Sequence, residues 1–81
     1  MEERRSNSRQ RVFKAGLIEF DGTAVKCVVR NLSMVGAGLD VDNPVIPHCF
    51  TLNIPSSNMR QSCRVIWRKQ KRIGLVFERA A

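Results

Sequence analysis

The sequence is poor in the residues from which enzymes usually build catalytic sites. It has one histidine, His48, and no tyrosine among its 81 residues. His48 lies beside Cys49, but neighbouring residues of an extended chain point to opposite faces, so a Cys–His nucleophilic pair would have poor geometry. Asp40 and Asp42 share one face of an expected strand, and nothing in the sequence beside them would raise a carboxyl pKa for acid–base chemistry. We therefore expect no catalytic residues and no enzyme activity.

Paired cysteines and long apolar runs are missing as well. The three cysteines, Cys27, Cys49 and Cys63, are far apart and form no CxxC pair. This pattern argues against a disulfide framework and against a zinc site, and it favours buried, unpaired thiols. No stretch approaches the roughly 20 apolar residues that span a bilayer, and the charged N-terminus does not have the pattern of a signal peptide. We expect a cytoplasmic protein without a cofactor, a metal or a membrane span.

Acidic residues are few compared with basic ones. Seven Asp and Glu stand against 14 Lys and Arg, which gives a formal net charge of +7. Such a balance favours an anionic partner: a nucleic acid, an anionic membrane surface or a phosphate-bearing small molecule. A chain of 81 residues also predicts one domain with a small core, so a ligand would bind at the surface.

Alternating apolar and polar residues predict short strands and little or no helix. A flexible arm is expected over residues 1–11 and a single domain over 12–78, because the arm has no apolar residue after Met1. Asp21-Gly22 predicts a tight hairpin, and a change of parity near Gly16 predicts a β-bulge. Six such strands predict an all-β barrel or sandwich, and a barrel would leave no open sheet edges. The strands are expected over 12–20, 25–30, 37–42, 50–54, 60–68 and 73–78.

The parity of the apolar residues also predicts a core. Trp67 shares its parity with Cys63 and Val65, which favours a buried side chain over an exposed platform for a nucleic-acid base. The predicted core consists of Phe13, Ile18, Val25, Cys27, Val29, Leu39, Phe50, Leu52, Val65, Trp67, Leu75 and Phe77.

Two clusters of polar residues suggest a binding function. Arg5 and Arg9 form an RxxxR motif, and two guanidiniums at this spacing on a mobile segment could fold over a phosphate or the O6/N7 edge of guanine. Asn31 and Ser33 share a parity and precede Gly36, where the absence of a side chain allows a close backbone approach. Taken singly, a solvated basic tail and an ordinary polar turn explain these clusters equally well.

Together, the two motifs resemble the paired signature of PilZ domains. The RxxxR motif is followed by Asn-x-Ser-x-x-Gly, and the stretches Val65–Arg68 and Arg72–Phe77 are similar to the last hairpin of that family. The resemblance covers roughly residues 4–78 and implies a six-stranded antiparallel β-barrel that receives cyclic di-GMP, a bacterial second messenger. It implies that the ligand orders the arm against the barrel. The implied ligand residues are Arg5, Arg9, Asn31, Ser33 and Gly36, with Arg4, Arg11 and Arg30 as auxiliaries on charge and proximity alone.

Two alternatives remain open at this point. The chain could be a PilZ-like adaptor that binds no ligand and acts through protein contacts. It could also be a small basic barrel that binds nucleic acid, although such proteins usually expose aromatic residues among basic ones, and most of the aromatic residues here have core parity. We expect cyclic di-GMP and an unidentified downstream protein as partners, and no DNA or RNA.

Overall fold

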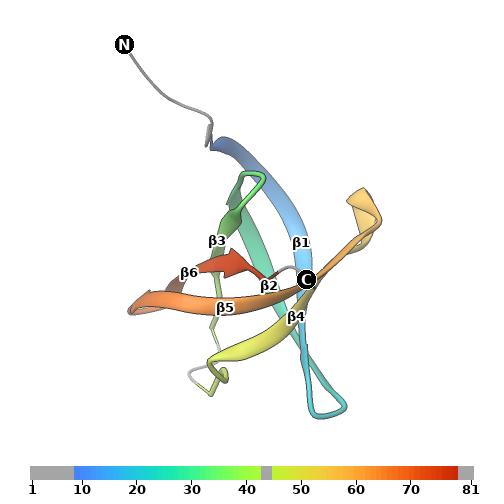
Figure 1. Ribbon diagram of the computed structural model, residues 1–81, viewed down its shortest axis with the longest axis vertical. Coiled ribbons are helices and arrows are strands. Elements are labelled where there is room, and N and C mark those ends of the chain that lie inside the picture. Colours follow the sequence, from blue (N-terminus) through green and yellow to red (C-terminus); the bar gives the residue numbers. More distant parts are fainter. Residues whose placement is uncertain (1–8, 43–44, 79–81) are drawn as a thin grey trace.

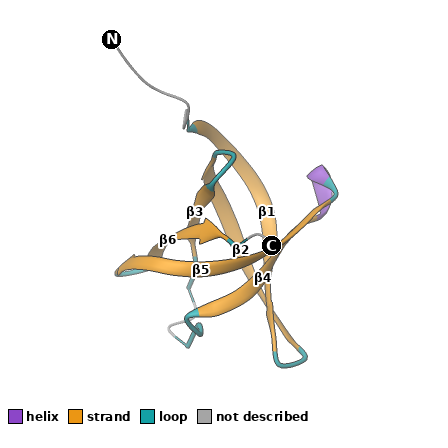
Figure 2. Cartoon of the chain, viewed as in Figure 1, coloured by secondary structure: helices purple, strands orange, loops and turns teal. Residues whose placement is uncertain are grey.

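Six antiparallel strands close into a barrel in the computed structural model, which describes residues 9–42 and 45–78 (Figure 1). The order around the barrel is β1-β2-β3-β6-β5-β4, and it confirms the six-stranded architecture. Within the described residues, the one element that is not a strand is a 3-10 turn, η1 (Pro55–Ser57) (Figure 2). The strands are β1 (Gln10–Phe20), β2 (Thr23–Leu32), β3 (Gly36–Asp40), β4 (Cys49–Ile54), β5 (Met59–Lys69) and β6 (Arg72–Phe77).

The N-terminal end of the barrel differs from the expected boundary by two residues. β1 begins at Gln10, so Gln10 and Arg11 form part of the first strand and pair with β2. The rest of the predicted flexible arm, apart from Arg9, lies outside the described residues. Among the described residues, no helix is long and apolar enough to cross a membrane.

Tight turns set the register of two hairpins. Asp21 and Gly22 both have positive φ, 49° and 76°, as two-residue turns that match the twist of the strands require. The turn therefore pairs Phe20 with Thr23, as the Asp-Gly sequence predicts. At the tip of the β5–β6 hairpin Gln70 takes φ 56°.

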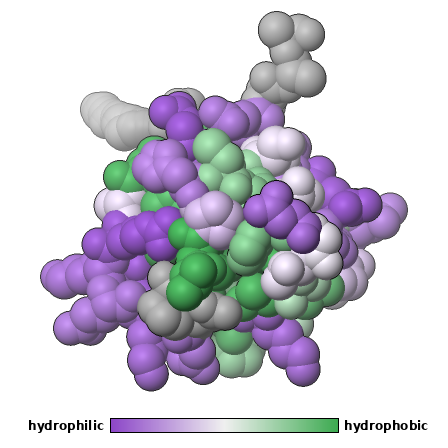
Figure 3. Space-filling view, turned by 90° about the horizontal axis from the view of Figure 1, so that it is seen from below, coloured by the Kyte–Doolittle hydropathy of each residue, from purple (hydrophilic) through white to green (hydrophobic). Residues whose placement is uncertain are grey.

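The core fills the inside of the barrel. From below (Figure 3), hydrophobic atoms lie at the centre of this end of the molecule with hydrophilic side chains around them. The predicted core is confirmed at Ile18, Cys27, Val29, Leu39, Phe50, Leu52, Val65 and Leu75, while Val25 and Phe77 are partly buried against it. The buried set also contains Ala37, Val41, Ile46, Ile54, Cys63 and Ile73.

The cysteines divide into two buried thiols and one exposed thiol. Desolvation raises the pKa of Cys27 to about 11 and that of Cys63 to about 12, so both stay protonated at neutral pH. Cys49 is exposed, and the expectation that all three would be buried is wrong there. None of the three is in a disulfide.

Trp67 is not a core residue, contrary to the prediction. Its side chain is 42% exposed. The register of β5 against β6 shifts between Val65 and Trp67, so that Ile66 and Trp67 together face Gly74. A bulge adds one residue and reverses the parity that follows it, and it therefore turns the indole to the outside of the barrel.

A second bulge explains the other error in the predicted core. Phe13 is 79% exposed, and the register of β1 against β2 shifts between Arg11 and Lys14. The predicted bulge near Gly16 is therefore misplaced: it lies earlier in the strand, where it turns Phe13 outward.

Candidate ligand-binding face

The outer surface of four adjacent strands carries a row of residues in direct register. Asn31 of β2 pairs with Gly38 of β3, Gly38 pairs with Gly74 of β6, and Gly74 pairs with Trp67 of β5. We call these four residues the glycine row. Three strand spacings of about 4.8 Å place its two ends roughly 14 Å apart. The row has an amide at one end and an indole at the other, and its two glycines are buried.

The two glycines of the row allow the end residues to lie flat on the barrel. A Cβ atom on Gly38 would lie 2.6 Å from Nδ2 of Asn31, and one on Gly74 would lie 2.1 Å from Nε1 of Trp67. Such distances are far inside van der Waals contact, so a side chain at either position would displace the amide or the indole. Because the two glycines have no side chain, the Asn31 amide and the Trp67 indole can pack directly on the backbone of the neighbouring strand.

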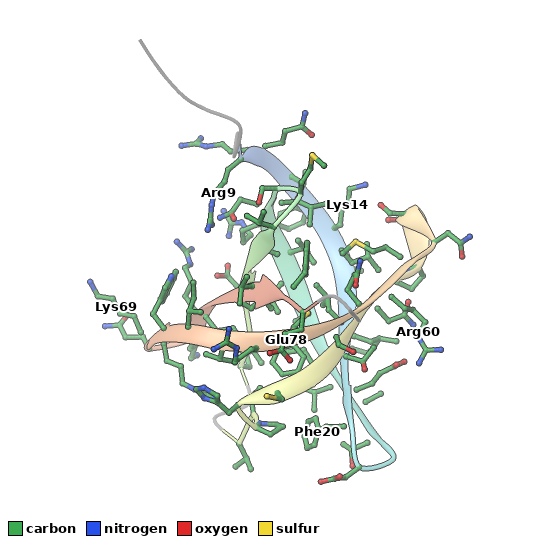
Figure 4. All side chains as sticks on the ribbon, in the orientation of Figure 1. Arg9, Lys14, Phe20, Arg60, Lys69 and Glu78 are labelled. Carbon is green, nitrogen blue, oxygen red and sulfur yellow. The ribbon has the colours of Figure 1, made fainter. Side chains whose placement is uncertain are left out.

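Arg9 joins the two motifs found in the sequence. Its Nη1 donates a hydrogen bond of 2.7 Å to Oδ1 of Asn31, across 22 positions of the chain. Arg9 comes just before β1, at the upper end of the barrel in Figure 4. Arg11 pairs with Asn31 in the β1–β2 ladder. Arg4 and Arg5 lie outside the described residues, so their predicted roles stay predictions.

Ser33 and Gly36 shape the turn between β2 and β3. The Ser33 Oγ accepts the backbone N–H groups of Val35 and Gly36, both at 3.2 Å, and the Ser33 N–H donates to the Gly36 carbonyl at 2.9 Å. A Cβ on Gly36 would lie 2.2 Å from the carbonyl oxygen of Leu75, so this glycine permits the close approach of β3 to β6. The structure thus shows a structural role for both residues, and their contact with a ligand stays a prediction.

Beside the glycine row, Asp40 links two arginines. Its Oδ2 accepts from Nη1 of Arg30 and its Oδ1 accepts from Nε of Arg72, each at 2.8 Å. Partial desolvation raises the pKa of Asp40, but the bonds from Arg72 and Arg30 outweigh it, and the pKa lies below its ordinary value. The Arg30 guanidinium also lies 5.7 Å from the centre of the exposed Phe13 ring.

An open hollow lies next to this group, at the β5–β6 hairpin. Its volume is about 650 Å³, which falls within the range of about 300–1,000 Å³ common for small-molecule sites. Trp67, Arg72 and Asp40 line it together with residues of the hairpin tip. The glycine row and the hollow therefore share the Trp67 indole as a wall.

Residues 9–42 and 45–78 contain no cluster of three or more His, Cys, Asp or Glu side chains that could hold an ion.

The described residues form a small closed antiparallel β-barrel that carries arginines, an amide and an indole on one outer face. The family model for the PilZ domain matches residues 3–81. The chain belongs to the PilZ domain family, as its two motifs predict. Searches of curated proteins and of solved structures each gave no match.

Sequence reasoning missed five residues of this face: Gly38, Asp40, Trp67, Arg72 and Gly74. The strands that carry them were predicted, but the register that brings the residues together was not. A glycine inside a strand often marks a close approach, so Gly38 and Gly74 were the available signal.

Replacing Gly38 with alanine should displace the Asn31 amide and break its bond to Arg9, and it should weaken by about tenfold the binding of a ligand such as cyclic di-GMP that depends on this amide, as the family resemblance implies. The melting temperature should change little, since the displaced atoms are the end of a half-exposed side chain. Calorimetry and thermal melting of the same preparation would check both statements. An unchanged affinity in Gly38→Ala would contradict the claim that the ligand depends on the place of the Asn31 amide.

Proposed function

We propose that this protein is a cytoplasmic receptor for cyclic di-GMP and passes the signal to a partner protein. The bond between Arg9 and Asn31 carries the proposal, because it brings the RxxxR and Asn-x-Ser-x-x-Gly motifs to one place on the barrel. Membership of the PilZ family supports the same ligand. The net charge of +7 favours an anion.

The chemistry of the face suits a dinucleotide with two phosphates and two guanines. An arginine supplies a planar set of donors that fits a phosphate or the O6/N7 edge of guanine, and it also stacks on a base. Asn31 offers an amide that pairs with a base edge. In this proposal Arg5 joins Arg9 over the ligand, with Arg4, Arg11 and Arg30 adding positive charge nearby.

Ordering of the arm would supply the signal. Fixing each backbone residue costs about 1–2 kcal/mol, and hydrogen bonds to charged groups contribute about 1.5–3 kcal/mol each. Residues of the arm would therefore settle on the barrel only when an anion offers several such bonds. The new surface made by arm and ligand would then be what a partner protein recognises.

Binding of single-stranded nucleic acid is the second candidate. Phe13 and Trp67 are both exposed, and they lie on strands among arginines and lysines, which is typical of proteins that bind single strands. The family match favours the dinucleotide. A competition between cyclic di-GMP and a short oligonucleotide would separate the two candidates.

Trp67 gives a direct optical test, since it is the one tryptophan of the chain. Its indole lies at the end of the glycine row and is 42% exposed. A base that stacks on it should quench its fluorescence. We expect a saturable decrease with cyclic di-GMP, little change with GMP or GTP, and no competition from the oligonucleotide. Quenching by the oligonucleotide alone would favour the second candidate.

A further inference from the structure

Arg72 is oriented by a carboxylate in a way that leaves its outer edge available. The Nε–H of Arg72 donates a hydrogen bond of 2.8 Å to Oδ1 of Asp40. The two terminal nitrogens, Nη1 and Nη2, are the pair with which an arginine binds the O6 and N7 atoms of guanine. The Arg72 side chain is 55% exposed and that of Asp40 is 31% exposed. Asp40 therefore fixes the Nε edge of the guanidinium on the protein while the Arg72 side chain remains accessible to solvent.

Trp67 supplies the second feature that a base requires. Trp67 packs over Gly74, and Arg72 lies two residues before Gly74 on the same face of β6. Residues two apart on a strand are about 6.8 Å apart, so Trp67 packs over a backbone position close to that of Arg72. Both line the hollow of about 650 Å³ at the β5–β6 hairpin. An aromatic surface therefore adjoins an oriented fork of donors.

The charge of the hollow agrees with a base attached to phosphates. Its lining has three basic residues, Lys69, Lys71 and Arg72, against two acidic ones, Asp40 and Asp42. Lys71 is 3.6 Å from Asp42, and both side chains are largely exposed. Lys69 pairs with Arg72 across the hairpin. A phosphate near the hairpin tip would meet a small excess of positive charge.

From these observations we propose that Arg72, positioned by Asp40, reads the O6/N7 edge of one guanine of the ligand while that base stacks on Trp67. This proposal rests on the proposed function and adds a residue that neither sequence motif contains. The arrangement discriminates against adenine, because adenine has an amino donor where guanine has the O6 acceptor. With adenine, the N–H donors of Arg72 would face the N6 amino group, which is also a donor.

The test compares cyclic di-GMP with cyclic di-AMP by calorimetry on the full chain. Arg72→Ala should weaken binding of cyclic di-GMP about tenfold and lower the preference for guanine over adenine by a similar factor, as loss of one bidentate contact would. Arg72→Lys keeps the charge but lacks the planar fork, so the preference should fall there as well. Asp40→Asn should lower it less, because the arginine remains but is held less firmly.

Arg60→Ala is the matched control. Like Arg72, Arg60 is an exposed arginine on a strand and forms an ion pair with one carboxylate, that of Glu19, at 2.6 Å. The Arg60→Ala substitution therefore removes the same charge as Arg72→Ala. Arg60 lies on the opposite side of the barrel from Lys69 (Figure 4). Its affinity and base preference should stay within about twofold of the unmodified chain, because a distant exposed charge has little effect at physiological salt.

The outcomes separate this inference from the proposed function. If the unmodified chain binds cyclic di-GMP and both Arg72 variants keep its affinity and base preference, the role of Arg72 is wrong and the receptor function stands. If Asp40→Asn keeps the full preference, the positioning role of Asp40 is wrong. If the unmodified chain binds neither dinucleotide, the proposed function and this inference both fail.

Discussion

Replacing Arg9 with lysine should weaken binding of cyclic di-GMP at least about tenfold, and Arg9→Ala should weaken it by at least as much. Arg9 contacts Asn31 at 2.7 Å and is therefore the arginine of the RxxxR motif that the barrel already holds close to the face. Lysine keeps the positive charge but offers neither a planar fork of donors nor a surface that stacks on guanine. Calorimetric titration of both variants would measure the loss.

Arg60→Lys is the control for this experiment, since Arg60 forms its ion pair with Glu19 away from the ligand face. Its affinity should match that of the unmodified chain. The melting temperature without ligand should be the same for both Arg9 variants, because Arg9 lies outside the strands and is exposed. An Arg9→Lys variant that binds normally would contradict the role of the guanidinium.

Replacing Leu39 with alanine should cost about 2–5 kcal/mol of unfolding free energy, the range for large-to-small changes in a core. Leu39 is 0% exposed and lies in β3, where it pairs with Val29 of β2 and Ile73 of β6. Leu39 is held by paired strands on both sides and is fully buried, so the cavity has little freedom to collapse. Urea denaturation followed by circular dichroism would measure the change.

Trp67→Ala is the informative comparison for stability. By its sequence parity Trp67 would be a core residue with an effect as large as that of Leu39, but its indole is 42% exposed and packs over Gly74 outside the barrel. We therefore expect a smaller loss than for Leu39→Ala. A larger loss in Trp67→Ala would mean that the indole contributes to the core after all.

The strands and most of the core could be predicted because burial in a barrel alternates with a period of two. Asp21-Gly22 fixed one hairpin from local backbone preference. The prediction failed at Phe13 and Trp67, where bulges add a residue and reverse the parity. Single-sequence parity cannot locate a bulge that depends on how two strands fit each other.

The site was predictable only in part, for a related reason. The motif residues Arg9 and Asn31 were found by their resemblance to a family, and the structure joins them by a hydrogen bond. Asp40 and Arg72 are 32 positions apart and meet only through the pairing of β3 with β6. Contacts of this kind follow from register, which neither composition nor spacing reveals.

Titration calorimetry with cyclic di-GMP, against GMP and GTP as controls, tests the central claim most directly. The account predicts a saturable heat with cyclic di-GMP and none comparable with either mononucleotide, since two guanines and two phosphates engage Arg9, Asn31 and the residues around them together. The absence of any saturable heat at high concentrations of cyclic di-GMP would contradict the receptor function and favour an adaptor that acts without ligand.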